Sequence, residues 1–168
     1  MNQVQEMFKL NDVARTDEAL ARLRGLFDVM AQQPGFLHAE VTRDAADAKT
    51  LLVFHAWTQL EDWQEFQKSQ WKVDFMAGRP EGLYNPGPVG MNWTLVAGEE
   101  SASGRFIRRQ FSETDLSGFH AQLFSAAGND DSYPARWMAL EHATKATGGD
   151  GWFEVLLARA RDAVSVVV

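Results

Sequence analysis

The chain has 168 residues, of which 45% are hydrophobic and 11% aromatic, and its formal net charge at pH 7 is −7. This length allows one domain or two small ones with a real core, and the composition excludes a disordered chain. The negative charge and the lack of a basic run argue against nucleic acid or an anionic membrane as the partner. A small aromatic or apolar molecule fits this chain better.

No stretch reaches the roughly 18 apolar residues that a membrane-spanning helix needs, and the N-terminus has no signal-peptide pattern. We therefore expect no membrane partner and a cytoplasmic location. The sequence contains no cysteine, which excludes disulfides, cysteine-ligated zinc, iron–sulfur clusters and thiol catalysis.

Alternating apolar residues predict a first strand over residues 3–10, which ends where the turn formers Asn11 and Asp12 begin. Thr16 then has the character of a helix N-cap. The helix that follows should bury one face and end before Pro34-Gly35. That face is made of Leu20, Leu23, Phe27 and Met30.

Residues 36–43 and 50–58 predict an antiparallel hairpin around a polar turn. Symmetric pairing about residues 46 and 47 would give one apolar face, suited to covering by helices. The pairs on that face are Leu37 with Ala56, Ala39 with Phe54 and Val41 with Leu52. The other face would pair Phe36 with Trp57, His38 with His55, Glu40 with Val53 and Thr42 with Leu51. Two histidines and a glutamate would thus share the face turned away from the helices.

An aromatic corner follows the hairpin. Thr58 and Glu61 have the spacing of a capping box and predict a helix from Gln59, with Trp63 and Phe66 on one face. Core packing is the ordinary explanation for such rings. Residues 77–90 are rich in glycine and proline and predict a loop, and residues 91–96 predict a further strand.

This β-α-β-β-α-β order predicts an α+β, ferredoxin-like unit, with an antiparallel sheet that has helices on one face. Its bare face must meet a second sheet, which would form an α/β barrel from two chains or within one chain. We therefore divide the chain into a first domain, 1–98, and a C-terminal extension, 99–168.

The extension is interpreted as a degenerate second repeat without its second helix. It would contain a strand at 105–111, a helix from Thr114 that carries Leu123 and Phe124, a hairpin at 136–160 and a closing strand at 164–168. Amphipathic helices at 134–147 and 152–163 are the alternative, and periodicity does not decide between the two.

The first half resembles the antibiotic biosynthesis monooxygenase family of dimeric α/β barrels. The resemblance covers residues 3–97 and depends on Pro34-Gly35-Phe36 and on the spacing Trp57-x5-Trp63-x2-Phe66-x2-Ser69. It implies a homodimer, and either cofactor-free oxygenation of aromatic compounds or haem degradation.

The resemblance also implies an asparagine at the end of the first strand, where Asn11 stands, and a tryptophan on the second helix, where Phe66 stands instead. The haem degraders carry a histidine ligand near Phe75 and Met76, so this chain departs from them. Because of this departure, haem binding ranks third among the hypotheses.

A cofactor-free oxygenase needs a dry aromatic cavity, a donor for the substrate anion and a proton acceptor. We predict catalytic roles for Asn11, His38 and His55. Trp57, Trp63, Phe66 and Glu40 are the predicted substrate-binding residues. A turn role for Asn11 and satisfied structural histidines are the simpler explanations.

No cofactor is expected, although His38, Glu40 and His55 also resemble a minimal set of metal ligands. The enzyme hypothesis predicts a cavity that these polar residues reach. A non-catalytic ligand-binding or assembly protein with the same fold is the alternative, and it predicts the same residues hydrogen-bonded without a pocket.

Overall fold

The computed structural model describes residues 1–44, 47–84, 89–98, 106–112, 122–126, 137–143, 152–160 and 166–167. The described elements of the first half are β1 (Asn2–Lys9), the 3-10 helix η1 (Val13–Arg15), α1 (Thr16–Met30), β2 (Phe36–Asp44), β3 (Thr50–Trp57), α2 (Leu60–Lys68), α3 (Gln70–Ala77) and β4 (Val89–Gly98). Those that follow are β5 (Phe106–Ser112), β6 (Gln122–Ala126), β7 (Trp137–Ala143), β8 (Trp152–Ala160) and β9 (Val166–Val167).

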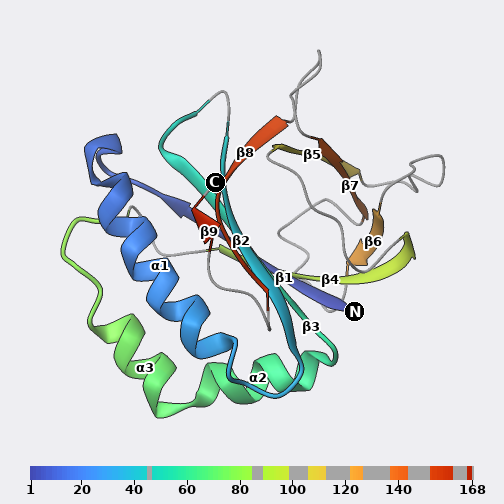
Figure 1. Cartoon of the computed structure of the whole chain (residues 1–168), viewed down its shortest axis with the longest axis horizontal. Helices are drawn as coiled ribbons and strands as arrows, with labels where there is room; N and C mark the ends of the chain where they lie inside the picture. The colour runs from blue at the N-terminus through green and yellow to red at the C-terminus, as the bar shows by residue number, and fades with distance from the viewer. Residues whose placement is uncertain are drawn as a thin grey trace.

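The strands form one antiparallel sheet in the order β2-β3-β1-β4-β6-β7-β5-β8-β9. Because β2 also pairs with β8, the strands from β2 to β8 close on themselves. Figure 1 shows the three α-helices on one side of β1, β2 and β3, with β5, β6 and β7 on the other side. Closure removes the exposed edges that an open sheet of this length would present.

The two groups of strands share one topology. The first runs β2-β3-β1-β4 and the second runs β6-β7-β5-β8, so each later strand takes the place of its counterpart four strands earlier. The α+β ferredoxin-like fold is confirmed, and one chain completes its own barrel. The division at residue 98 and the homodimer stay predictions.

The predicted details of the second half need correction. The hairpin is β6–β7, and β5 lies between β7 and β8, so the predicted hairpin at 136–160 is wrong. The alternative helices at 134–147 and 152–163 are also wrong, because β7 occupies the middle half of the first range and β8 occupies most of the second. Leu123 and Phe124 belong to β6 and not to a helix. The earlier part of that predicted helix lies outside the described residues.

The predicted hairpin register is also wrong beyond its first pair. Phe36 faces Trp57 as predicted, but a bulge between Phe36 and His38 shifts the remaining pairs by one residue. Ala39 therefore faces His55, and His38 faces Ala56. Since neighbouring residues of a strand point to opposite faces, His38 and His55 lie on opposite faces of the sheet.

The main core lies between the helices and the sheet. The helix face predicted for α1 is confirmed, because Leu23, Phe27 and Met30 are fully buried and Leu20 packs against them. Strand β3 is buried along both faces from Leu51 to Trp57, which places it in the middle of the molecule.

The aromatic corner differs from the predicted helix. The residue before α2 is Gln59, which makes no side-chain cap, and Thr58 donates instead to the Gly35 carbonyl at 3.2 Å. The capping-box prediction is therefore wrong. The helix also breaks at Ser69, whose Oγ accepts a hydrogen bond from the Lys72 N–H and so caps α3.

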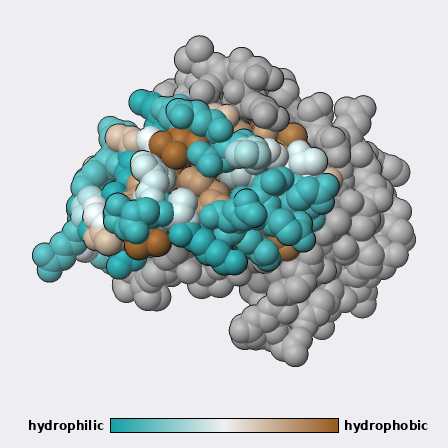
Figure 2. All heavy atoms as spheres, turned by 90° about the horizontal axis from the view of Figure 1, so that it is seen from below, coloured by the Kyte–Doolittle hydropathy of each residue, from teal (hydrophilic) through white to brown (hydrophobic). Residues whose placement is uncertain are grey.

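The coloured part of the face in Figure 2, which shows the described residues, is mostly polar and carries small, separate hydrophobic areas. Among the described residues, the large hydrophobic side chains that are exposed are Met7, Val13, Trp71 and Val73. No helix in the described part of the chain is long and apolar enough to cross a membrane.

Candidate functional site

A buried polar cluster lies between the sheet and the helices α2 and α3. The Trp57 indole Nε1–H donates to His55 Nδ1 at 2.8 Å, and both side chains are 0% exposed. On the other side of the imidazole, His55 Nε2 lies 3.7 Å from Glu6 Oε2. Glu6 comes from β1, and the buried Lys72 comes from α3.

The charges of this cluster follow from its contacts. Burial lowers the pKa of His55, so the imidazole is neutral and its Nδ1 is free to accept the indole proton donor. Burial alone raises the pKa of Glu6, but the Lys72 ammonium and His55 outweigh burial and hold it below its ordinary value. Glu6 is therefore a carboxylate near a neutral His55 at neutral pH.

A series of aromatic rings runs outward from this cluster. The Trp57 ring centroid lies 5.9 Å from Trp63 and 6.1 Å from Phe66. Phe66 is stacked at 6.0 Å with Trp71, and Trp71 is stacked at 5.2 Å with Phe75. The series thus connects a fully buried indole with Trp71, which is 38% exposed.

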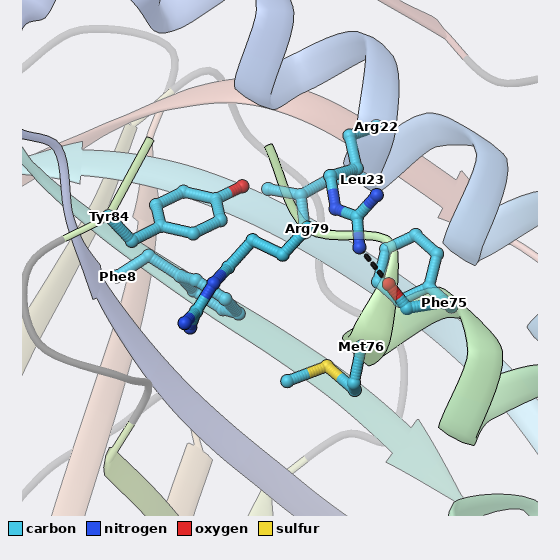
Figure 3. A pocket seen from close by; sticks show the side chains of 7 residues that line it. All are labelled: Phe8, Arg22, Leu23, Phe75, Met76, Arg79 and Tyr84. Carbon is cyan, nitrogen blue, oxygen red and sulfur yellow. Dashed lines mark hydrogen bonds between the residues drawn. The ribbon is translucent and has the colours of Figure 1, made fainter. Parts of the chain in front are cut away.

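A small hollow opens beside Phe75, between α1, α3 and β1 (Figure 3). Its walls are Phe8, Leu23, Phe75 and Met76, with the polar groups of Arg22, Arg79 and Tyr84. Its free volume is about 10 Å³, which is room for about one water molecule. The hollow is apolar on most sides and cationic at two points.

Tyr84 provides the polar group that stands out in this hollow. Its ring packs on Phe8 with centroids 4.9 Å apart, and its hydroxyl is buried with no hydrogen-bond partner among the described residues. Burial raises the pKa of Tyr84 to about 12, so the hydroxyl keeps its proton at neutral pH. It can therefore donate to a bound molecule.

The two guanidinium groups differ in how firmly their positions are fixed. Arg22 stacks over the Phe75 ring at 3.9 Å and donates to the carbonyls of Phe75 and Gly78, which fixes its position. The exposed Arg79 side chain extends between Tyr84 and Met76 in Figure 3. Arg22 thus shapes the wall, while Arg79 and Met76 fill the opening.

Comparison with known proteins agrees with this architecture. Residues 12–77 match the family model for antibiotic biosynthesis monooxygenase. They span α1, β2, β3, α2 and α3, which carry His55, Trp57 and Lys72 of the buried cluster, while Glu6 on β1 lies outside the match. Residues 12–77 form an antibiotic biosynthesis monooxygenase domain. The match begins just after Asn11 and contains the Pro34-Gly35-Phe36 and Trp57-to-Ser69 segments on which the resemblance depends.

Two crystal structures share the fold of the monooxygenase domain and of the chain beyond it. One, a "putative monooxygenase" from Fusobacterium nucleatum subsp. nucleatum ATCC 25586, has a TM-score of 0.67 and 10% identity, and the match covers 99% of this chain and 97% of that one. The other, a "putative monooxygenase" from Lactobacillus acidophilus NCFM, has a TM-score of 0.51 and 10% identity over 92% of this chain and 77% of that one. No curated protein matches the chain.

The monooxygenase domain brings some of the predicted site residues together. His55, Trp57, Trp63 and Phe66 form one buried cluster, in which the His55 and Trp63 ring centroids are 4.4 Å apart. Asn11 is exposed, and its amide donates to the Gly82 carbonyl at 2.7 Å. The hydrogen bond ties the loop to the end of β1, and the catalytic role predicted for Asn11 stays a prediction.

His38 and Glu40 lie on the face of the sheet that is turned away from the helices, apart from His55. Burial, with His55 as a second cause, lowers the pKa of His38 to about 4, and Glu40 is buried. The described residues contain no group of three His, Asp or Glu side chains placed to hold a metal ion. The roles predicted for His38 and Glu40 in catalysis and binding stay predictions.

Haem does not fit the monooxygenase domain as it stands. Phe75 and Met76 occupy the region where the haem degraders carry their histidine ligand, and both line the hollow. A free volume of about 10 Å³ cannot receive a porphyrin. We therefore derive no chemistry through haem.

Tyr84, Arg22 and Arg79 were not among the site residues predicted from the sequence. One signal was present, because Leu83-Tyr84 is an apolar pair inside a loop of glycines and prolines. Such a pair indicates a loop that is anchored to the core, and both residues are indeed buried. The bridge between Leu10 and Tyr84 fixes this anchor at the end of β1.

Proposed function

We propose that this protein is a monooxygenase that oxidises small phenols or hydroquinones with dioxygen and needs no metal or flavin. The hollow beside Tyr84 is the proposed site. The observation that carries this proposal is the Tyr84 hydroxyl, a buried donor without a partner among the described residues, set in an aromatic wall beside two guanidinium groups. The match of residues 12–77 to the family model for antibiotic biosynthesis monooxygenase supports the reaction type.

The substrate must displace side chains to enter. Met76 is half-buried and Arg79 is exposed, so rotation of these two residues enlarges the hollow without moving β1 or α1. The apolar rings of Phe8 and Phe75 then contact the substrate ring. Arg22 keeps its position because it is held by backbone carbonyls.

The reaction begins when the phenol loses its hydroxyl proton to water at the mouth of the hollow. The Tyr84 hydroxyl and the Arg79 guanidinium stabilise the phenolate, since hydrogen bonds to an anion are strong in a site that excludes water. The phenolate gives one electron to dioxygen, and the resulting phenoxyl radical and superoxide join through a new carbon–oxygen bond.

The adduct is a peroxide at the ring carbon opposite the phenol oxygen. In a hydroquinone, where that carbon carries a hydroxyl group, the peroxide forms at a neighbouring ring carbon that carries hydrogen, and the product is a hydroxyquinone. The peroxide takes up a proton, the oxygen–oxygen bond breaks, and the ring carbon loses its hydrogen as a proton. One oxygen atom stays in the quinone product and the other leaves as water. The balanced reaction is phenol plus dioxygen to quinone plus water, and the substrate supplies all the electrons.

The test is oxygen consumption by the purified protein with a panel of small phenols and hydroquinones, together with detection of the quinone. We expect one dioxygen consumed for each quinone formed, and no loss of rate with a metal chelator. Arg79→Gln should lower the rate, while Arg24→Gln, which alters a residue of α1 outside the hollow, should not.

A panel that is bound but not oxidised would instead support the non-catalytic binding protein. The small volume of the hollow favours this second function, because a ring that displaces Met76 and Arg79 would leave little space for dioxygen beside it. Binding is measured by quenching of tryptophan fluorescence, which separates binding from oxidation in the same samples.

The proposal also includes the oligomeric state, the location and the ligand expected from the sequence. We propose a homodimer in the cytoplasm, with the small aromatic molecule as its ligand. Light scattering of the full chain tests the oligomeric state, and a mass of one chain in solution would refute the homodimer.

A further inference from the structure

The environment of Trp57 suits a change of oxidation state. In the ground state an indole N–H is a very weak acid, so its hydrogen bond to His55 transfers nothing. An indole that has lost one electron is a far stronger acid. An imidazole nitrogen 2.8 Å away is then in place to receive the proton without any rearrangement.

The atoms beyond the imidazole favour that transfer. His55 Nε2 and Glu6 Oε2 lie 3.7 Å apart, and each lacks a hydrogen-bond partner among the described residues. When His55 Nδ1 takes the indole proton, the imidazole becomes a cation beside this carboxylate. A small approach of the two side chains would then turn the contact between a carboxylate and a neutral imidazole into a hydrogen bond between opposite charges.

A structural role alone does not account for this arrangement. Any backbone carbonyl would satisfy the Trp57 N–H, as buried indoles commonly require. Here the acceptor is a base that can hold a proton, and an ionised carboxylate lies on its far side. Lys72 keeps Glu6 ionised despite its burial.

The aromatic rings give electrons a route to Trp57. Centroid separations between 5.2 and 6.1 Å connect Trp57 through Phe66 to Trp71, and Trp71 to Phe75 in the wall of the hollow. Trp63 lies beside the same route, 5.9 Å from Trp57. Trp71 reaches the surface, where a reductant can meet it.

We propose that Trp57 is a redox-active tryptophan that gives an electron along the ring series through Phe66 to Trp71, while its indole proton passes to His55 Nδ1. The oxidant is an alkoxyl radical, which forms when the oxygen–oxygen bond of the peroxide adduct breaks into two radicals, or a peroxyl radical derived from that adduct; this source of the oxidant rests on the proposed oxygenase function. This role goes beyond the oxygenation of the substrate.

The step is balanced in atoms and charge. The oxidant gains one electron and becomes the peroxide or alkoxide anion, which takes its proton from water. Trp57 becomes a neutral radical because it loses one electron and one proton, and His55 becomes an imidazolium. A reductant at Trp71 returns the electron, and the proton moves back from His55 to the indole.

The test uses the full chain and a ruthenium(III) tris-bipyridine complex, generated by a laser flash, as the one-electron oxidant. Because this probe replaces any radical from the hollow, the result does not depend on the proposed oxygenase activity. Transient absorption distinguishes the neutral tryptophan radical from its cation. Electron paramagnetic resonance measures the yield of the radical.

Three variants assign the radical. Trp57→Phe should remove most of the long-lived neutral radical. His55→Asn keeps an acceptor near the position of Nδ1 but no base, so a cation should replace the neutral radical. Trp71→Phe changes an exposed residue, so the fold is retained, and radical formation should slow; Val73→Ala on the same helix is the matched control and should leave the rate unchanged.

Two results would overturn the proposal. One is a neutral radical of unchanged yield in Trp57→Phe, which would place the radical on another tryptophan. The other is an equal rate of neutral radical formation in the wild type, Trp71→Phe and Val73→Ala. Circular dichroism of each variant confirms the fold, and the exposed Trp71 variant keeps the test decisive if a buried variant does not fold.

Discussion

Replacing Tyr84 by phenylalanine should raise stability and lower activity at once. The hydroxyl is buried without a partner among the described residues, and such a group costs about 1–3 kcal/mol in the folded state. Tyr84→Phe removes that cost and keeps the ring that packs on Phe8 with centroids 4.9 Å apart. We expect the free energy of unfolding in urea to rise by about 1 kcal/mol.

The same variant should oxidise phenols more slowly. A hydrogen bond to a charged group is worth about 1.5–3 kcal/mol, which corresponds to a rate loss of about 10- to 100-fold. Tyr84→Leu is the contrast, because it also removes the buried ring and should destabilise the fold. Unfolding of Tyr84→Phe at a lower urea concentration than the wild type would refute this prediction, since the hydroxyl would then have a stabilising partner.

Three further predictions concern the fold and the alternatives. Gly35 has a φ of +71°, and a Cβ there would lie 1.9 Å from the Asp62 Oδ2. Gly35→Ala should therefore lower the free energy of unfolding in urea by more than the same change made in an Asp62→Ala background, where only about 1–2 kcal/mol of backbone strain remains. Equal losses in the two backgrounds would show that the added Cβ does not collide with Asp62. The pKa of His38 falls from 6.5 to about 4 on folding, so as the pH is lowered the unfolded chain takes up this proton before the folded chain does. The free energy of unfolding should therefore drop by up to about 3 kcal/mol between pH 6.5 and pH 4. His38→Gln should remove that part of the drop, and an unchanged pH profile would refute it. Added haemin should give no sharp visible band of bound haem, and a stoichiometric band would restore the haem hypothesis.

The order of the first six main elements could be predicted because each has its own local signal. The helix from Thr16 to Met30 shows a strong apolar period and ends at Pro34-Gly35. The hairpin register could not be predicted, because β3 is buried on both faces and offers no alternation to fix the pairing. The bulge near His38 left no mark in the sequence.

The second half was harder to predict for a different reason. Apolar residues in segments of five to nine residues satisfy both a helical and an extended pattern, and β6 to β8 have these lengths. Closure of the sheet decides in favour of strands, since β2 needs β8 as its second neighbour. That contact joins residues more than 100 positions apart and is invisible to local patterns.

The candidate site was predictable in its aromatic part alone. The spacing of Trp57, Trp63 and Phe66 predicted one aromatic cluster, and the three rings pack together. The partner of His55 could not be foreseen, because Glu6 reaches it from β1 through a strand pairing that the sequence does not encode locally. Tyr84 enters the site from a loop whose path depends on the finished core.

The proposed oxygenase reaction is tested most directly by oxygen uptake of the metal-free, flavin-free protein with a small phenol or hydroquinone. We expect one dioxygen consumed per quinone formed, with a rate that falls about 10- to 100-fold in Tyr84→Phe while that variant stays folded. Oxygen uptake no faster than in a protein-free control, across the whole panel of substrates, would contradict the proposed reaction.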